Sequence, residues 1–241
     1  RYPGADEDVL SHISFETKPG ETTAFIGSTG SGKSTLVKLM NRFYDVSRGS
    51  IEINGVDIRK YNLESLRTQI GYVAQKAHMF KGSIQSNICF GKPEASVEEM
   101  VHAATVAQAS DFISTREHGY EDEIAEDGTN ISGGQKQRLS IARVILKKPS
   151  LYIYDDSFSA LDFKTDATLR KALKPEVKNA IFFVVAQRIS TIMDSDMIIV
   201  LDEGQIIGMG THAQLLKDCS VYQEIAHSQL TQKELDDYER N

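Results

Sequence analysis

A run of residues near the start of the chain combines glycines with a lysine and several hydroxyl side chains. Its sequence is Gly27-Ser28-Thr29-Gly30-Ser31-Gly32-Lys33-Ser34-Thr35, which fits the phosphate-binding pattern Gly-x-x-x-x-Gly-Lys-Ser/Thr. Glycines let the backbone curve closely around phosphates, with successive N–H groups pointing inward. We expect Lys33 to reach the β- and γ-phosphates of a nucleotide, and the Ser34 hydroxyl to bind Mg²⁺.

An acidic residue ends an apolar run much later in the chain. Residues 151–154 have the sequence Leu-Tyr-Ile-Tyr, which is typical of a buried strand, and Asp155 follows them. In enzymes with a phosphate-binding loop, an aspartate in this position holds Mg²⁺, here through water. The alternative is a buried strand that merely ends in an acidic turn. The glycine-rich loop elsewhere in the chain favours the magnesium site.

A second glycine-rich segment, Ile131-Ser132-Gly133-Gly134-Gln135, precedes a helical pattern. A serine hydroxyl, glycine N–H groups and the N-terminus of a helix together make an anion site. We therefore expect this segment to face the γ-phosphate of a nucleotide. The alternative is that Ser-Gly-Gly is only a loop that leads into a helix.

The hydrophobic pattern indicates which elements position these segments. Helical spacing follows the first glycine-rich loop and dominates residues 83–146, where strand signals vanish. Strands alternating with helices predict an α/β fold with a largely parallel core sheet. We expect residues 231–241, a polar tail, to be helical or frayed. Strands are expected at residues 9–15, 22–26, 70–74, 151–154, 181–186 and 197–201, and hairpins at residues 50–58, with an Asn54-Gly55 turn, and 197–208.

The bulk composition excludes some classes of protein. The chain has 241 residues and a net charge of −7, which argues against a nucleic-acid-binding protein. Cys89 and Cys219 show no metal-ligand spacing, so we expect reduced thiols in a cytosolic protein. The longest apolar runs are far shorter than the ~20 residues that span a bilayer. Because the chain begins with Arg1 rather than Met, we expect it to be a fragment of a longer polypeptide.

The second glycine-rich segment, with Lys136-Gln137-Arg138 after it, resembles the signature motif of ABC ATPases, which other enzymes with a phosphate-binding loop lack. The resemblance covers almost the whole chain. It implies a P-loop NTPase (RecA-like) core with an antiparallel β edge and an inserted α-helical subdomain. Residues 1–75 and 148–241 would form the core, and residues 76–147 the helical signature subdomain. The implied cofactors are ATP and Mg²⁺.

The resemblance also assigns roles to single residues. Tyr2 matches the aromatic residue that stacks on adenine in this family, and its alternative is an exposed strand tyrosine. Gln75 matches the glutamine that senses Mg²⁺ and links to the membrane domain. The residues expected to bind nucleotide are Tyr2, Gly27, Ser28, Thr29, Gly30, Ser31, Gly32, Lys33, Ser34, Thr35, Gln75, Asp155, Ser132, Gly133, Gly134 and Gln135; those expected to bind metal are Ser34, Gln75 and Asp155; those expected to act in catalysis are Lys33, Gln75, Asp156 and Gln187.

Partners follow from the same resemblance. In this family two ATP-binding domains pair head to tail, so that each ATP lies between the P-loop of one and the signature motif of the other. Residues 159–162, Ser-Ala-Leu-Asp, match the loop that crosses to the partner, and residues 126–128 lie where exporters carry a coupling loop. The segment from Phe80 to Gly91 is similar to the exporter branch. The expected place is the cytoplasmic face of the cell membrane, as part of an integral membrane transporter with its own transmembrane domain.

Two positions depart from the family pattern, and both concern hydrolysis. Asp156 stands where the family has a glutamate as general base, and Gln187 stands where it has a switch histidine. Aspartate is one methylene shorter, and a displacement of about 1 Å can reduce a rate about a hundredfold. Glutamine can donate a hydrogen bond, but it carries no positive charge. We expect slow hydrolysis at this site, and the alternative is that both changes are harmless.

The two departures resemble those of heterodimeric bacterial multidrug exporters, which join one degenerate and one competent site. The intact signature motif would complete the competent site, whose P-loop and catalytic glutamate come from a different subunit. Drug, lipid and peptide export all remain open, and this analogy favours drugs.

Other functions fit the sequence less well. A chromosome-organising ATPase head would need long coiled coils, and the chain has no heptad stretch. A small-molecule kinase would leave the Ser-Gly-Gly-Gln segment unexplained. A purely regulatory half of a heterodimeric transporter, which binds ATP without hydrolysing it, is the remaining alternative.

Overall fold

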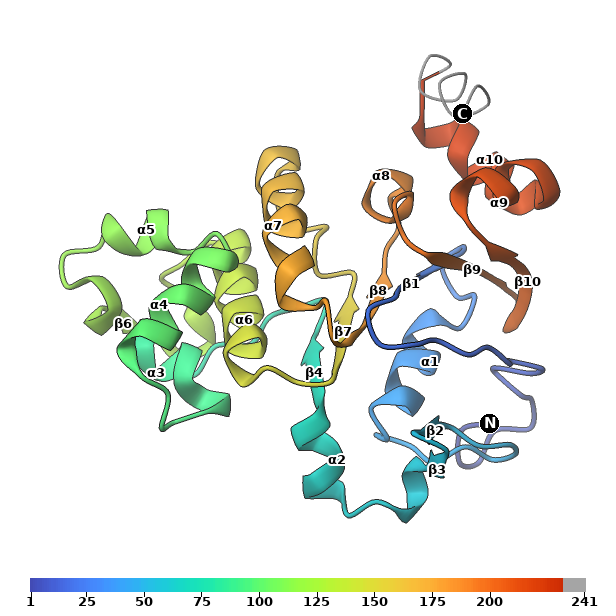
Figure 1. Ribbon diagram of the computed structural model, residues 1–241, viewed down its shortest axis with the longest axis horizontal. Helices are drawn as coiled ribbons and strands as arrows, with labels where there is room; N and C mark the ends of the chain where they lie inside the picture. The colour runs from blue at the N-terminus through green and yellow to red at the C-terminus, as the bar shows by residue number, and fades with distance from the viewer. Residues whose placement is uncertain (232–241) are drawn as a thin grey trace. The chain divides into compact units, whose positions relative to one another are not determined.

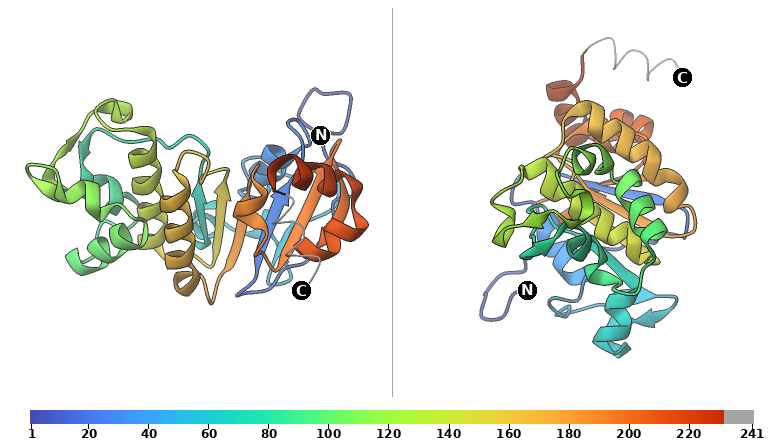
Figure 2. Two further views of the ribbon diagram at one scale, coloured as in Figure 1. Left: turned by 90° about the horizontal axis from the view of Figure 1, so that it is seen from above. Right: turned by 90° about the vertical axis from the view of Figure 1, so that its left-hand side faces the viewer.

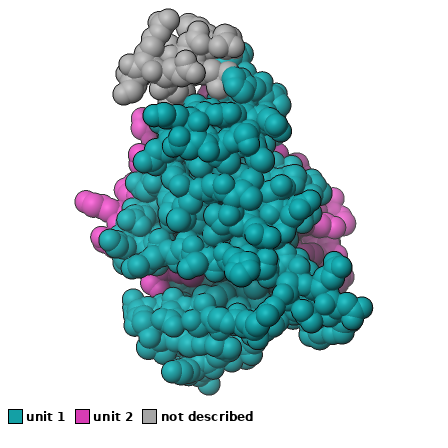
Figure 3. Space-filling model, turned by 90° about the vertical axis from the view of Figure 1, so that its right-hand side faces the viewer, with its two compact units in different colours: residues 1–70, 181–241 teal, residues 71–180 magenta. Residues whose placement is uncertain are grey.

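The computed structural model describes residues 1–231 (Figure 1, Figure 2). The chain forms two compact units, which we call the first unit, residues 1–70 with 181–241, and the second unit, residues 71–180 (Figure 3). The expected C-terminal tail lies outside the described residues from position 232 onward. The boundaries of these units differ from those of the subdomains expected from the resemblance, which are residues 1–75 with 148–241 and residues 76–147. The division into those subdomains stays a prediction.

The first unit is built on a sheet with the strand order β10-β9-β1-β8. β1 is parallel to both β8 and β9, and β10 is antiparallel to β9. Ala24 of β1 lies beside Val184 and Ile198, and all three are buried. The parallel strands and the antiparallel edge that the sequence predicts are therefore confirmed. The bounds are β1 Thr22–Ile26, β8 Ile181–Val185, β9 Met197–Asp202 and β10 Gln205–Gly210.

Helices and a small hairpin complete the first unit. The hairpin is confirmed, because Asn54 and Gly55 both have positive φ, 53° and 73°, as a two-residue type I′ turn requires. Leu36, Val37 and Met40 form the buried face of α1, the helix that follows the glycine-rich loop. The bounds are α1 Lys33–Met40, β2 Glu52–Ile53, β3 Val56–Asp57, η1 Ile58–Lys60, α2 Leu63–Gln69, α8 Ile189–Ile192, α9 His212–Asp218 and α10 Ser220–Gln229.

The second unit combines two neighbouring strands, β4 and β7, with a group of helices. The helices between residues 84 and 147, green to yellow in Figure 2, gather around α6, which packs against α3 and α4. Leu139, Ile141 and Ile145 lie on the buried side of α6. The bounds are β4 Ile70–Val73, β5 Gly82–Ser83, α3 Ile84–Ile88, η2 Cys89–Gly91, α4 Val97–Val106, α5 Ser110–Ser114, η3 Gly119–Glu121, β6 Glu123–Ile124, η4 Glu126–Gly128, α6 Gly133–Lys147, β7 Leu151–Asp155 and α7 Phe163–Glu176.

The strand expected at residues 9–15 does not form. His12 has φ 55°, in the left-handed region, which interrupts an extended chain. Ser11 instead donates its backbone N–H to the carbonyl of Gly204 at 2.9 Å. Phe15 packs edge to face against Phe25, with ring centroids 5.5 Å apart. The apolar residues of the segment thus serve packing without pairing in a sheet, and the prediction of a strand is wrong.

The expectation that residues 83–146 contain no strand is wrong at one place. β5 and β6 pair antiparallel, with Gly82 opposite Ile124 and Ser83 opposite Glu123. Each strand has two residues, which is too short for an alternating pattern to show in the sequence. Among the described residues, no helix is long and apolar enough to cross a membrane. Cys89 and Cys219 are both free cysteines.

Replacing Gly204 by alanine should destabilise the protein more than the same change at Gly49. Both glycines have left-handed φ, 74° and 79°, so each substitution costs about 1–2 kcal/mol of backbone strain. A Cβ at Gly204 would also lie 2.1 Å from the carbonyl oxygen of Val9, whereas a Cβ at Gly49 would meet nothing within 4 Å. We expect Gly204→Ala to lower the free energy of unfolding by at least about 1 kcal/mol more, measured by urea denaturation. Equal losses would contradict this packing.

Candidate functional site

The loop between β1 and α1 has the backbone geometry of a phosphate cradle. Gly32 has φ 101° and stands at the N-cap of α1, where it offers no side-chain oxygen to the first N–H groups of the helix. Such N–H groups are directed along the helix axis and attract an anion. The loop residues Ser28, Thr29 and Gly30 are exposed, so the cradle is open to solvent. The residues present fit a triphosphate.

The Lys33 side chain folds back over this loop. Its ammonium donates to the carbonyls of Gly27 and Ser28, both at 2.7 Å, and to the hydroxyl of Ser31 at 3.2 Å. The sequence-based expectation placed this amino group at the phosphates, and the structure holds it at the loop that would surround them. Ser34, the expected metal ligand, is exposed at the first turn of α1.

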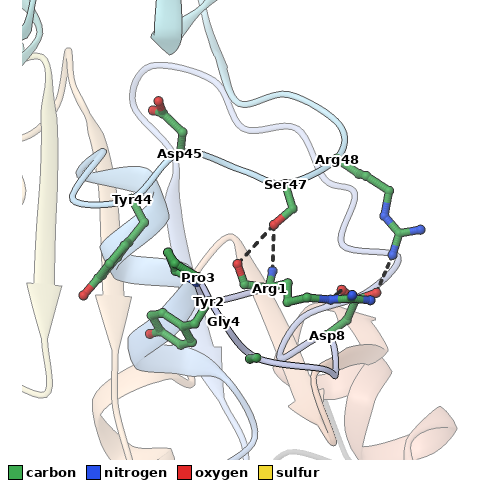
Figure 4. Close-up of a pocket in the computed structure, with 10 residues that line it drawn as sticks. Arg1, Tyr2, Pro3, Gly4, Asp8, Tyr44, Asp45, Ser47 and Arg48 are labelled. Atoms are coloured by element: carbon green, nitrogen blue, oxygen red, sulfur yellow. Dashed lines mark hydrogen bonds and ion pairs between the residues drawn. The ribbon is translucent and has the colours of Figure 1, made fainter.

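Tyr2 borders an open cleft of about 740 Å³ in the first unit (Figure 4). Its hydroxyl lies 3.0 Å from the hydroxyl of Thr35, which ties the ring to the start of α1. Tyr44 meets the ring edge to face, with centroids 5.1 Å apart and planes at 88°. The Tyr2 ring is therefore held on two sides and could act as a stacking platform. The cleft is lined by Arg1, Tyr2, Pro3, Gly4, Ala5, Asp8, Tyr44, Asp45, Ser47 and Arg48.

Sequence reasoning missed Tyr44, because nothing in its neighbourhood resembles a motif. Figure 4 also shows Asp8 between two arginines, Arg1 and Arg48, which both form ion pairs with its carboxylate. The hydrogen bond from Arg1 and the charges of both arginines hold the pKa of Asp8 below its usual range. This carboxylate therefore stays negative and satisfied at the rim of the cleft.

The second unit places the two successive acidic residues against different partners. Asp155 accepts a hydrogen bond from the phenol of Tyr72, whose oxygen lies 3.2 Å from Oδ2. Burial, and then the charge of Asp155, raise the pKa of Tyr72, so the phenol stays protonated at neutral pH. Tyr72 is a second residue that the sequence analysis missed, because only the fold shows that β4 lies beside β7.

Asp156 is bound by Gln75. The amide Nε2 of Gln75 lies 2.9 Å from Oδ2 of Asp156, and Asp156 is buried. Since a carboxylate only accepts hydrogen bonds, the amide nitrogen faces Asp156 and the amide oxygen points away from it. Asp156 also has φ 47°, which is unusual for a residue other than glycine and is often found at functional sites. Two of the four predicted catalytic residues, Gln75 and Asp156, are thus in contact.

The signature segment forms the start of α6. Ser132 is the N-cap: its hydroxyl accepts from the N–H of Gln135 at 3.2 Å, and the Gln135 side chain accepts from the N–H of Ser132 at 2.9 Å. This reciprocal capping box explains why a helix begins here. A Cβ on Gly134 would lie 3.3 Å from the carbonyl of Ala160, so the loop of residues 159–162 passes beside the helix start. Asp162 in turn caps α7 through Thr165.

Gln187 follows β8 in the first unit and is exposed. Its carbonyl accepts a hydrogen bond from Nε2 of Gln229 at 2.8 Å, and Oε1 of Gln229 accepts from the N–H of Ile189 at 2.9 Å. One side chain of α10 therefore bonds to the backbone at Gln187 and at Ile189, on both sides of Arg188. Sequence analysis had no means of finding Gln229, because the two residues are 42 positions apart.

The predicted site residues fall into both units. Tyr2, the glycine-rich loop and Gln187 belong to the first unit, while Gln75, Asp155 and the signature segment belong to the second. Within residues 1–231 no group of three or more His, Cys, Asp and Glu side chains could hold a metal ion. The expected metal ligands Gln75 and Asp155, an amide and a carboxylate of the second unit, offer oxygens of the kind that Mg²⁺ prefers.

Comparison with known proteins gives matches along most of the chain. A family described as "ABC transporter" matches residues 10–159. An uncharacterized ABC transporter ATP-binding protein of Mycobacterium bovis is 47% identical over 95% of this chain and 39% of its own length. The ATP-dependent lipid A-core flippase of Vibrio vulnificus is 40% identical over 93% of this chain and 39% of its own length. The chain thus spans about two fifths of the length of each of these two relatives.

A solved structure agrees with the fold. The structure of a bacterial Atm1-family ABC exporter with ATP bound superposes with a TM-score of 0.91 at 37% sequence identity, covering 94% of this chain and 40% of that chain. The expected fold class, an α/β P-loop NTPase with a mixed sheet and helical parts, is therefore confirmed.

Removing the ring of Tyr2 should weaken the binding of ATP. Stacking of a base on an aromatic ring is worth about 1–3 kcal/mol, so we expect Tyr2→Ala to raise the Kd for ATP about tenfold or more. Tyr2→Phe keeps the ring and loses only the contact with Thr35, so its Kd should change less than about threefold. Isothermal titration calorimetry measures both. Inorganic tripolyphosphate, which has no base, is the control, and an equal loss of its binding by Tyr2→Ala would contradict the stacking role.

Proposed function

The chain belongs to the ABC transporter family, and on that premise we propose that it is the ATP-binding domain of an exporter. The observation that carries the proposal is the family match over residues 10–159, in a chain whose glycine-rich loop has the geometry of a phosphate cradle. In this proposal the domain dimerises around ATP and drives export of a substrate across a membrane. Its place is the cytoplasmic face of that membrane, beside a transmembrane domain.

Each candidate site residue receives a role in this proposal. The glycine-rich loop and Lys33 bind the phosphates, and Tyr2 stacks on adenine. Ser34, Asp155 and Gln75 are the residues that would bind Mg²⁺, and the ion would supply positive charge to offset the negative charge of the phosphates. The amide oxygen of Gln75 suits this role, because its nitrogen is the atom bound to Asp156.

The signature segment serves a second ATP-binding domain. Ser132 uses its hydroxyl oxygen to cap α6, so its O–H proton can be donated to a phosphate that arrives from outside. Gly133 is exposed, and a Cβ there would meet nothing within 4 Å, which leaves room for a ligand. Binding energy at such a shared site favours the closed pair, and ATP thereby shifts the population toward closure.

Hydrolysis at the chain's own P-loop is slow in this proposal. Asp156 has a shorter side chain than a glutamate, and Gln75 already holds its carboxylate at 2.9 Å. A base that falls about 1 Å short of its water can lose about a hundredfold in rate. Gln187 provides no positive charge for the γ-phosphate. The partner is then a different subunit, whose own P-loop and catalytic glutamate work with Ser132–Gln135 of this chain.

Lengthening Asp156 tests the degenerate site. We expect Asp156→Glu to raise ATP turnover at this site at least about tenfold, because the carboxylate regains the missing methylene. Phosphate release at saturating ATP is the measurement, on a full-length transporter in which the partner's catalytic glutamate is replaced by glutamine. Asp218→Glu, an exposed change at the end of α9, is the matched control and should leave the rate unchanged. Fast turnover that Asp156→Glu does not alter would refute slow hydrolysis.

Disabling each site in turn tests the asymmetry. Ser132→Ala acts on the ATP that the partner holds, so it should reduce steady-state turnover of the transporter strongly, by about a hundredfold if one donor to the transition state is lost. Asp156→Asn acts on the slow site and should reduce the steady-state turnover of the transporter less than about threefold. Equal losses would contradict a partnership of unequal sites.

The alternative is a purely regulatory half that binds ATP and never hydrolyses it. Single-turnover measurements on the complete transporter distinguish the two. Product formed slowly when the partner's site is disabled supports a slow enzyme, and no product at any time supports the regulatory half. The transported substrate is selected by membrane helices in either case. The proposed substrate classes are drugs, lipids and peptides. The analogy with heterodimeric multidrug exporters, which rests on Asp156 and Gln187, favours drugs.

A further inference from the structure

The hydroxyl of Tyr72 donates a hydrogen bond to a carboxylate, although a tyrosine that only packs in the core does not need such an acceptor. Tyr72 lies in β4, next to β7, and its phenol donates to Oδ2 of Asp155, the residue that ends β7. The side chain is only partly buried, so water could satisfy the hydroxyl in place of a carboxylate. The acceptor in the structure is instead Asp155, one of the candidate magnesium ligands.

Two further hydrogen bonds show that residues 73–75 are aligned with the residues that follow β7. The hydroxyl of Ser157 donates to the carbonyl of Val73 at 3.0 Å, and the amide of Gln75 donates to Asp156 at 2.9 Å. β4 and β7 are hydrogen-bonded neighbours in the sheet, and these two side-chain bonds add to their alignment, so the phenol of Tyr72 is not needed to fix the strands. Its bond acts on the carboxylate of Asp155 itself.

We propose that Tyr72 is a positioning residue for magnesium, whose phenol orients the Asp155 carboxylate toward the hydrated ion. The inference rests on the proposed function, in which Asp155 holds Mg²⁺. A carboxylate can rotate about its Cβ–Cγ bond, and a donor on Oδ2 selects the rotation that presents Oδ1. Carboxylates that hold metals are commonly oriented by such outer hydrogen bonds, and losing one costs about 10–100-fold in metal affinity.

The phenol suits this task better than a charged donor. It carries no positive charge, so it orients Asp155 without neutralising the negative charge that attracts the ion. It is also rigid, because the ring has two rotatable bonds and is partly buried. A phenylalanine in its place would keep the ring and remove only the donor.

The test measures metal affinity with and without the phenol. Mn²⁺ replaces Mg²⁺ as the probe and is titrated into the full-length protein with bound ATP, while electron paramagnetic resonance reports the free ion. We expect Tyr72→Phe to weaken Mn²⁺ binding about tenfold and to leave the Kd for ATP without metal unchanged. Tyr61→Phe is the matched control, because Tyr61 is also half-buried and donates to the carbonyl of Ile53 at 3.0 Å.

A third variant separates the inference from the function on which it rests. Asp155→Asn should weaken Mn²⁺ binding at least as much as Tyr72→Phe does. If Asp155→Asn has no effect, the proposed metal ligand is wrong and the inference is overturned with it. If Asp155→Asn weakens binding and Tyr72→Phe does not, only the inference is overturned. A loss by Tyr72→Phe that is equal for ATP without metal, or that Tyr61→Phe reproduces, shows a merely structural phenol and overturns it as well.

Discussion

A triphosphate concentrates negative charge, and in the proposed function the chain binds it with backbone N–H groups at the starts of two helices. The requirements of the two starts differ. Gly32 precedes α1 without a side chain, so nothing stands between the loop and an anion. Ser132 precedes α6 with a side chain that already caps the helix. The first start can surround phosphates of its own ligand, and the second can only add to phosphates that another surface holds. In the proposed function this difference makes the dimer necessary.

The same constraint explains why neighbouring acids have different surroundings. Uncompensated carboxylates would repel a triphosphate, so each must be directed to a particular partner. Tyr72 directs Asp155 without adding charge, and Gln75 occupies Asp156. Asp156 is buried and has a left-handed backbone, so its short side chain has little freedom to reach elsewhere. In the proposed function, this arrangement favours holding metal and nucleotide over rapid hydrolysis.

Local sequence patterns predicted the strands and the turn that carry the site. They failed at residues 9–15, where the apolar side chains pack on the core without strand pairing. The β1 strand, the Asn54-Gly55 turn and β7 follow from apolar runs and turn residues, and all three formed. Residues 9–15 show the same alternation, yet they contact Gly204 and the apolar core instead of pairing with a strand. A periodic pattern reports which side is buried, and a buried side does not require a sheet partner.

Motif and spacing alone determined the family, the phosphate-binding loop and the signature segment, because these are contiguous and their chemistry is set by residue type. They also identified Asp156 and Gln187 as departures. Tertiary structure decided what those residues touch: Gln75 on Asp156, and Gln229 on the backbone around Gln187. Tyr44 and Tyr72 likewise became visible only when the fold placed them beside Tyr2 and Asp155. Hydrogen bonds between residues that are 42 to 83 positions apart depend on how strands and helices pack, and no local pattern records that.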